Sequence, residues 1–418
     1  MVYRNIKNMK ILAIGDTADN IYILQKFAQK FEIHLINFPR KQDALKTQSG
    51  DVEFFDSLLI SKQVKKIKQI KNSYDLCIVV SWAAARIAYL AGINYIMYFV
   101  GGDITTPPFI KNPTLSYAKE PTHNFNFLER YFYKKVFDTS RLCITASDAY
   151  YNALKKHRDD GIRIDKVSVD TTLFNPNIKP INHTKNKFTF LSAQRIGKEK
   201  GFDKIWKAIS LCKSDFEILQ VEWFIEKTTE EKKFKQEIIE TIPTQVKLIP
   251  LIDRKELGRY FIFADAILGN MRSGFPQGIE RDAAYCKKPV IAYCDVNQPM
   301  MVNGGKVIPP FLPNSNDPKI IAETIDKLVT DEKFRNEIAE AEYEYIKKIS
   351  SPEVVNDEWE KIFEKVIKKY KKINRKSQKL LPIENLISKI LEKFIYVRKM
   401  KQRNMDAWGK EEYEKLFS

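Results

Sequence analysis

Cationic side chains follow one apolar segment near the middle of the chain, at a spacing that suits phosphate. The segment KFTFLSAQRIGKEKGF places Arg195, Lys198 and Lys200 between an expected strand over Phe188–Ala193 and a helix that begins at Gly201. A guanidinium fork, ammonium groups and the free N–H groups of a helix N-terminus together favour an anion. The alternative is a solvated basic loop on a basic protein, and this segment alone leaves both interpretations open.

A second strand-to-helix junction lies within residues 265–290. An expected strand over Ala266–Leu268 leads into a Gly- and Pro-containing loop, and a helix that carries Glu280 and Asp282 begins near Gln277. The backbone amides of residues 273–278 are free to meet an anion, and a carboxylate inside the helix can accept hydrogen bonds from sugar hydroxyls. The alternative is an acidic first turn that stabilises only its own helix dipole.

The elements that must position these residues alternate between strand and helix in both halves of the chain. Further strands are expected at Ile11–Ile14, Ile33–Phe38, Leu76–Val80, Tyr95–Val100, Leu142–Thr145, Phe216–Val221, Val246–Ile249 and Val290–Tyr293. Such alternation is typical of parallel α/β sheets, and the polar segment 174–187 between the halves is typical of a linker. The sequence therefore predicts two α/β domains, whose ligands bind at the carboxyl ends of the strands.

Composition and charge exclude several classes of protein. With 44% hydrophobic residues in 418, the chain can bury real cores, and neither G-x-G-x-x-G nor G-x-x-x-x-G-K-[ST] occurs. Five scattered cysteines without a CxxC pair, and four scattered histidines, predict no disulfide framework and no metal site. The apolar stretch Cys77–Val100 is interpreted as strand, helix and strand instead of a membrane span, and we expect a cytoplasmic protein.

The last residues hold much of the positive charge. The chain carries a formal net charge of +17, and residues 371–418 contribute 13 Lys and Arg against 6 Asp and Glu. Residues 382–403 form an expected helix with six apolar residues on one side: Ile383, Leu386, Ile387, Ile390, Leu391 and Phe394. This amphipathic, basic helix either packs on the protein or lies on an anionic membrane surface, which would be the inner membrane face, and both interpretations stay open.

Three motifs in order resemble a retaining glycosyltransferase of the GT-B fold, similar to the large family 4 group. Arg195 and Lys200-Gly201 stand at the family's donor-diphosphate pair. Residues 169–176 (VDTTLFNP) match its interdomain signature, and residues 282–290 (DAAYCKKPV) match its Glu-Ala-Met-Ala-Cys-Gly-x-Pro-Val run. The resemblance implies two Rossmann-like domains facing a cleft: acceptor domain 1–178, donor domain 186–355, and C-terminal helices 356–418, the first crossing back to the N-terminal domain.

The resemblance also implies the roles of the site residues. Arg195, Lys200 and Glu280 would be catalytic, and the donor would be held by Gly274, Phe275, Pro276, Gln277, Gly278 and Asp282. The family pattern of two Glu separated by seven residues is not met, because counting back from Pro289 puts the second acid on Asp282 and the first on Gly274. Either Glu280 serves as the second acid or the chain lacks the first Glu, so the sugar-contacting carboxylate stays open.

The activity implied is hexosyl transfer from a nucleoside-diphosphate sugar to a glycan or lipid-linked acceptor, with retention and without a metal or other cofactor. Side-chain cations would stabilise the leaving diphosphate, and the acceptor would dock at Gly15-Asp16 and Gly102-Asp103, each of which is otherwise a tight turn. Two alternatives remain: a non-catalytic sugar-nucleotide or glycan binder, and a nucleic-acid-binding protein. No nucleic-acid partner is expected, because aromatic residues are not interleaved with the basic runs.

Overall fold

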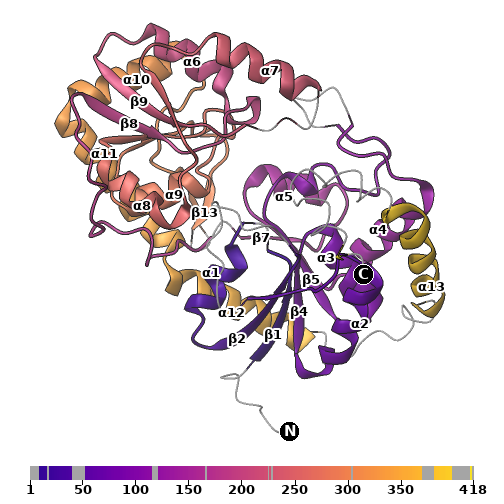
Figure 1. Cartoon of the computed structure of the whole chain (residues 1–418). Coiled ribbons are helices and arrows are strands. Elements are labelled where there is room, and N and C mark those ends of the chain that lie inside the picture. Colours follow the sequence, from indigo (N-terminus) through magenta and orange to yellow (C-terminus); the bar gives the residue numbers. More distant parts are fainter. Residues whose placement is uncertain are drawn as a thin grey trace.

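The chain folds into two α/β units that lie side by side (Figure 1). The computed structural model describes residues 9–16, 18–39, 52–114, 121–164, 167–224, 226, 229–302, 305–369, 381–397 and 415–416. None of the described helices is both long and apolar enough to cross a membrane. The stretch 77–100 is instead a strand, a helix and a second strand, as predicted.

A seven-stranded parallel sheet forms the N-terminal unit, with strand order β3-β2-β1-β4-β5-β6-β7. Its strands are β1 Met9–Ile14, β2 Phe31–Asn37, β3 Glu53–Phe54, β4 Leu76–Val80, β5 Tyr95–Phe99, β6 Cys143–Thr145 and β7 Ile162–Arg163. Its helices are α1 Asn20–Phe27, α2 Ile60–Ile70, η2 Lys71–Ser73, α3 Trp82–Ala91, η3 Gly102–Ile104, α4 Phe127–Thr139 and α5 Asp148–Lys155. The central strands β4 and β5 are buried along their whole length, which explains their continuous apolar sequence.

The C-terminal unit has a five-stranded parallel sheet of order β10-β9-β8-β11-β12, and a separate antiparallel pair β13-β14. The strands are β8 Phe188–Ser192, β9 Phe216–Val221, β10 Val246–Ile249, β11 Ala266–Leu268, β12 Val290–Ile291, β13 Met300–Val302 and β14 Gly305–Val307. The helices are η4 Lys198–Lys200, α6 Phe202–Leu211, α7 Thr229–Glu240, α8 Arg254–Phe263, α9 Gly278–Tyr285, α10 Pro318–Thr330 and α11 Glu332–Ser350. The prediction of parallel α/β sheets is confirmed in both halves of the chain.

Each sheet is covered on both faces. One face of the N-terminal sheet packs on α2, α3 and α4, and the other packs on α1 and on α12, which spans Pro352–Lys369. Trp359 and Phe363 of α12 are buried there, so this late helix completes the core of the N-terminal unit. In the C-terminal sheet, α8, α9 and α11 cover one face and α6, α7 and α10 the other.

The last described helix, α13 (Leu381–Leu391), continues into a π-helical turn, η6 (Glu392–Tyr396), and lies against α2 and α3. In Figure 1 it forms an outer layer on the right of the N-terminal unit. Residues 398–403 of the expected amphipathic helix lie outside the described residues. Within the described part, the helix packs on the protein.

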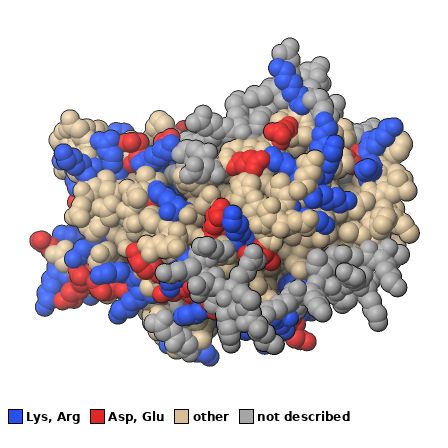
Figure 2. Space-filling view, turned by 90° about the horizontal axis from the view of Figure 1, so that it is seen from below, with Lys and Arg blue, Asp and Glu red and all other residues tan. Residues whose placement is uncertain are grey.

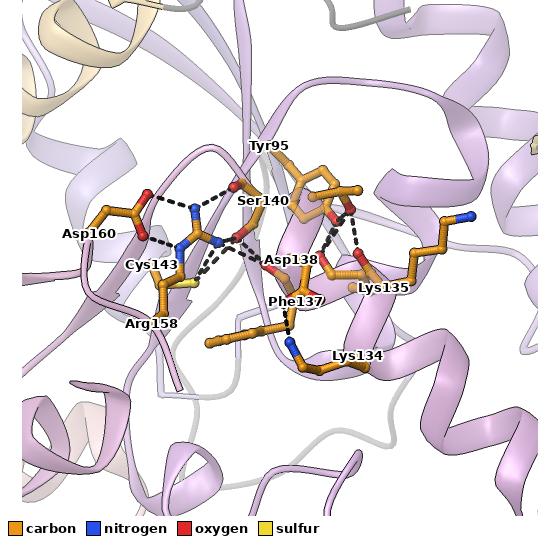
Figure 3. Close-up of polar contacts among 11 residues, drawn as sticks. Tyr95, Lys134, Lys135, Phe137, Asp138, Ser140, Cys143, Arg158 and Asp160 are labelled. Atoms are coloured by element: carbon orange, nitrogen blue, oxygen red, sulfur yellow. Dashed lines mark hydrogen bonds and ion pairs between the residues drawn. The ribbon is translucent and has the colours of Figure 1, made fainter. Parts of the chain in front are cut away.

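The C-terminal end of α4 is fixed by Arg158 (Figure 3). The guanidinium Nη1 donates to the carbonyl of Phe137 at 2.8 Å, and Nη2 donates to the carbonyl of Ser140 at 2.7 Å. It also pairs with Asp160 and contacts the Cys143 thiol at 3.6 Å, where burial raises the pKa of that thiol to about 11. A cation at the end of a helix satisfies carbonyls that have no partner inside the helix, so Arg158 joins α4 to β6.

Candidate functional site

The turn from β8 into α6 presents the first group of predicted residues. Gly201 adopts a φ of +81°, and a Cβ there would lie 3.0 Å from the backbone carbon of Met271. The same close approach allows the Met271 N–H to donate to the carbonyl of Lys200 at 3.0 Å. Glycine is therefore required here both by the left-handed backbone and by the neighbouring chain, and the turn is pinned to the loop after β11.

The loop from β11 into α9 is organised by polar side chains. The Asn270 side-chain oxygen accepts from the backbone N–H groups of Arg272 and Ser273, at 2.7 and 2.9 Å. Glu280 is buried, and its two carboxylate oxygens accept from the backbone N–H groups of Asn270 and Gln277, at 2.8 and 2.9 Å. Glu280 thus fixes the start of α9 and the end of β11 together.

The two junctions meet at Lys200. Its ammonium donates to the side-chain oxygen of Gln277, the residue directly before α9. Burial lowers the pKa of Lys200 below its usual 10.5, with Glu280 raising it and Arg195 lowering it. A half-buried ammonium beside a helix N-terminus favours a bound anion, because an anion would stabilise the charged form that desolvation disfavours.

The other two cations of the first junction are paired. Arg195 donates to Glu199, with distances of 2.7 Å from Nε and 2.6 Å from Nη2, and its guanidinium lies over Trp223. Lys198 pairs with Glu230 at 3.3 Å and is more than a third exposed. Of these two cations Lys198 is the more exposed, with 38% of its side chain accessible against 24% for Arg195.

Gly274 and Gly278 differ in what surrounds them. Gly274 has a φ of +77°, and a Cβ there would lie 3.0 Å from Cβ of Asp295. At Gly278, the first residue of α9, an added Cβ would meet nothing within 4 Å. The open space at Gly278 leaves room for a ligand at the beginning of α9, but the predicted free amides are partly taken, because the N–H groups of Ser273 and Gln277 donate to Asn270 and Glu280.

Asp282 does not join the group around Lys200. It is buried, and its carboxylate accepts from Arg254 of α8 at 2.8 Å. Burial raises the pKa of Asp282 to about 6, although Arg254 lowers it. Asp282 and Arg254 therefore form a buried ion pair between α9 and α8, and Glu280 is the acid that lies next to Lys200.

On the N-terminal side, Gly15 and Asp16 follow β1. Gly15 has a φ of +76°, and a Cβ there would lie 2.6 Å from the carbonyl oxygen of Val80. Asp16 is buried, and its carboxylate accepts a hydrogen bond from the Tyr22 N–H at 2.8 Å. Its backbone N–H donates to the side-chain oxygen of Asn37, and its carbonyl accepts from the Asn37 side-chain amide. These bonds hold the start of α1 against β2, so the turn has a structural role whatever else it binds.

Gly102 and Asp103 lie in η3, directly after β5. Burial raises the pKa of Asp103 from 3.8 to about 7, even though the backbone N–H groups of Gly101 and Ile104 lower it. One of its carboxylate oxygens is buried without a hydrogen-bond partner. A carboxyl in this state can exchange a proton near neutral pH, or accept a hydrogen bond from a hydroxyl that reaches it.

Contacts between the two units bring these edges toward each other. Phe275, in the loop before α9, lies edge-on to Tyr150 of α5 with ring centroids 6.1 Å apart. Arg163 of β7 donates to the carbonyl of Pro299 at 2.7 Å. Burial raises the pKa of Tyr98 on β5, and the positive charge of Arg281 on α9 lowers it. The α9 end of the C-terminal unit therefore faces the carboxyl edge of the N-terminal sheet.

A further pair lies in the residues that join the two units. Lys26 of α1 contacts both carboxylate oxygens of Asp170 at 2.9 Å and Oγ1 of Thr172 at 2.6 Å. Asp170 is buried, and it belongs to the VDTTLFNP segment. An ion pair at this position helps to fix the N-terminal unit relative to the connecting segment.

Sequence analysis did not single out Asn270, Arg272 or Glu199. Arg272 pairs with Asp203 of α6 at 2.8 Å, so it ties the loop after β11 to the helix that follows Lys200. A signal was available for Asn270, because it directly follows a strand and Gly269, but nothing in the spacing indicates its partners. Among the described residues, no group of three His, Cys, Asp or Glu could hold a metal ion.

Comparison with known proteins agrees with this geometry. Residues 174–345 match the family of glycosyl transferases group 1. Sucrose-phosphate synthase from Thermosynechococcus elongatus superposes with a TM-score of 0.63 at 15% identity, covering 86% of this chain and 99% of that one. The protein has the GT-B fold.

Two further structures of this fold are similar over most of their length. HepE from Anabaena, in complex with UDP-glucose, gives a TM-score of 0.60 at 16% identity, covering 85% of this chain and 100% of that one. A glycosyltransferase from Rickettsia africae gives 0.58 at 15% identity, covering 86% and 99%. No curated protein sequence matches significantly. The resemblance to a family 4-like GT-B glycosyltransferase is confirmed, and the family match supports a nucleotide-sugar glycosyltransferase.

Proposed function

We propose that this GT-B protein transfers a hexosyl group from a nucleoside-diphosphate sugar to a hydroxyl of a glycan or lipid-linked acceptor, with retention and without a metal. The observation that carries the proposal is the meeting of two strand-to-helix junctions at Lys200, which contacts Gln277 at the start of α9. The charges of Glu280, Arg195 and Glu199 all act on Lys200 and shift its pKa. Such a group of cations and backbone N–H donors suits a diphosphate.

The cations would act on charge that grows during the reaction. When the bond between the sugar C1 and the phosphate oxygen breaks, the leaving nucleoside diphosphate gains negative charge, which Lys200 and Arg195 stabilise more in the transition state than in the ground state. Arg195 is paired with Glu199, so a diphosphate would have to compete with that carboxylate. Glu199 therefore lowers the affinity of the site for the anion.

The acceptor hydroxyl would approach from the N-terminal unit. In a retaining transfer without a dedicated base, the acceptor oxygen bonds to C1 on the face that the phosphate leaves, and its proton passes to the leaving phosphate oxygen. Asp103 supports this placement of the acceptor, because its buried, unpartnered oxygen lies just after β5, at the carboxyl edge of the sheet. It would orient a hydroxyl there by accepting its hydrogen bond.

The first experiment is a calorimetric binding panel of UDP, GDP, ADP and CMP on the wild type and on Arg195→Ala. The similar HepE is described in complex with UDP-glucose, so UDP is the first nucleotide to test. Binding of one diphosphate that the variant weakens at least tenfold would support the donor site. No binding of any diphosphate would overturn the proposal. With the nucleotide known, NMR of the product anomer tests retention, and excess EDTA during turnover tests metal independence.

A non-catalytic sugar-nucleotide binder is the second candidate, favoured by one observation. Gly274 has no carboxylate where the family has its first Glu, and both oxygens of Glu280 already accept backbone N–H bonds. A protein that binds the nucleotide sugar but releases no nucleoside diphosphate, with or without a broad acceptor mixture, would support this candidate. Release of nucleoside diphosphate that Lys200→Met abolishes would exclude it.

A further inference from the structure

The helix α13 packs on the protein through a face that carries both polar and apolar side chains, because Leu391 is buried there and Leu381 and Ile387 are partly buried against the same core. Glu384 is 3% exposed; it accepts from the Tyr89 hydroxyl at 2.5 Å and pairs with Lys135 of α4. Ser388, equally buried, accepts from the guanidinium of Arg86 at 3.0 Å. In Figure 3 the side chain of Lys135 extends from α4 away from the Arg158 network. Buried polar partners of this kind fix the rotation of the helix about its axis.

The following turn, η6, repeats the arrangement. Glu392 is 6% exposed, and its carboxylate accepts from the backbone N–H of Ser61 at 2.8 Å and from the Ser61 hydroxyl at 3.0 Å. Asn385 donates to the carbonyl of Leu90 at 3.1 Å. Both acidic residues of α13 and η6 therefore face inward and are paired with the N-terminal unit.

Four other large apolar side chains of α13 and η6 face outward. Ile383, Leu386, Ile390 and Phe394 are 56%, 60%, 49% and 69% exposed, at the three- and four-residue spacing of a single helical stripe. A helix on a water-soluble surface normally buries such a stripe and exposes its charges. Here two of the six predicted apolar residues, Ile387 and Leu391, turn inward and the other four stay exposed, so these four form an apolar surface of the kind that binds a partner.

Lysines border this stripe. A groove of about 380 Å³ between α2 and α13 is lined by Lys62, Lys65, Lys68 and Lys389. Burial lowers the pKa of Lys68, and the charges of Lys71 and Lys389 lower it further. The α2 sequence ISKQVKKIKQI contains no acidic residue. In Figure 2, Lys and Arg side chains lie over both ends of the molecule, including the right, the side on which Figure 1 places α2 and α13.

We propose that this surface, the exposed stripe of α13 and η6 with the lysines of α2 and α13, docks on an anionic lipid bilayer. The stripe would enter the boundary between headgroups and acyl chains, and the lysines would contact the headgroup phosphates. The sequence supports the charge match, because Arg398, Lys399, Lys401 and Arg403 directly follow η6 and its neighbour Val397. A second copy of the chain fits less well, because a two-fold interface would bring the lysines of both copies together.

Vesicle co-sedimentation of the full-length protein tests the proposal. We expect binding to vesicles of phosphatidylcholine mixed with phosphatidylglycerol, weak binding to phosphatidylcholine alone, and loss of binding as salt rises. Leu386→Ser combined with Phe394→Ser should weaken binding more than tenfold. Lys65→Gln combined with Lys389→Gln should weaken it by roughly 25-fold, about fivefold for each lysine near the headgroups.

Matched controls lie on α7 of the C-terminal unit. Ile239 is 44% exposed and Lys232 and Lys233 are exposed, so Ile239→Ser and the double change Lys232→Gln, Lys233→Gln alter similar side chains elsewhere. They should bind vesicles as the wild type does. All variants should keep the wild-type melting temperature and nucleotide affinity, which separates this inference from the proposed transfer reaction, on which it does not depend.

Three outcomes would overturn the proposal. They are equal affinity for neutral and anionic vesicles, vesicle binding that survives the Leu386→Ser, Phe394→Ser change, and no vesicle binding at all. Light scattering of the same samples tests the competing occupant. A concentration-dependent dimer that these two substitutions dissociate would show that a second copy covers the stripe.

Discussion

Replacing Lys200 by methionine tests the assignment of the donor site most directly. Methionine keeps much of the length of the side chain but removes the ammonium that contacts Gln277. A hydrogen bond to a charged group contributes about 1.5–3 kcal/mol, which is roughly a 10- to 150-fold change in affinity. We therefore expect the Kd of the nucleoside diphosphate to rise by a factor in this range.

Lys198→Met is the matched control, because Lys198 lies two residues away in the same short helix, η4. Lys198 is 38% exposed and pairs with Glu230 at 3.3 Å, and exposed pairs of this kind contribute about 0–1 kcal/mol. We expect this variant to bind the nucleotide within about fivefold of wild type. The two lysines carry the same charge and lie in the same short helix, so a large difference between them tests the placement of each side chain.

The assay is titration calorimetry in buffers with different ionisation enthalpies. Burial lowers the pKa of Lys200 in the free protein, and a phosphate next to it would raise that pKa again. At a pH between the two values, binding must take up a proton, and the affinity must fall as pH rises through this interval. Lys200→Met should lose the proton uptake as well as the affinity.

Three results would refute the reasoning. Equal losses in Lys198→Met and Lys200→Met would mean that the basic segment acts only through its total charge. Wild-type affinity in Lys200→Met would place the phosphate elsewhere. Reduced affinity with unchanged proton uptake would mean that another group titrates and that Lys200 only supports the fold of the loop.

Three further predictions concern stability and the acceptor side. The pKa of Asp103 is about 7 in the folded chain and 3.8 without burial, so its contribution to stability falls by at most about 4 kcal/mol as pH rises through that interval. Asp103→Asn should therefore melt at a higher temperature than wild type at pH 8, but not at pH 4. It should also lose transfer activity. Gly201→Ala should cost about 1–3 kcal/mol in urea unfolding and weaken nucleotide binding, since its Cβ meets Met271, whereas Gly101→Ala, with open space around it, should be neutral. Arg158→Ala should lower the free energy of unfolding by about 2–4 kcal/mol, because it removes the guanidinium donors to the Ser140 and Phe137 carbonyls at the end of α4 and leaves Phe137 only its bonds from Ser140. An unchanged urea midpoint would contradict this.

The order of strands and helices could be predicted because the central strands are buried on both faces. Continuous apolar runs such as CIVV and YIMYF identify β4 and β5 without any other information. The two-residue strands β3 and β7 were not predicted, since they lie at the edges of the sheet and have no apolar run of their own. Such edge strands form because the backbone of the adjacent strand has N–H and C=O groups with which they can hydrogen-bond.

The candidate site was predictable as far as local spacing carries information. Arg195, Lys200 and Gly201 follow a recognisable strand, so their position at its carboxyl end could be inferred. The partners could not, because Asp282 pairs with Arg254, 28 residues away in the sequence. Spacing alone therefore left Glu280 and Asp282 as equivalent acids, while the fold places one beside Lys200 and the other between two helices.

Helical periodicity grouped six apolar residues of α13 and η6 on one side, but the structure turns two of them, Ile387 and Leu391, inward and leaves four exposed. An amphipathic helix normally buries its apolar side, and that rule would put Leu386 and Phe394 in the core. Instead, the face that carries Glu384 and Ser388 packs on α3, because α3 presents the buried groups Arg86 and Tyr89 to it. Leaving a guanidinium and a hydroxyl buried without partners costs more than exposing a few apolar side chains, provided that those side chains find another apolar phase. The orientation of α13 is thus itself an argument that its outer stripe has a partner, and the lysines around it make an anionic bilayer the partner that fits.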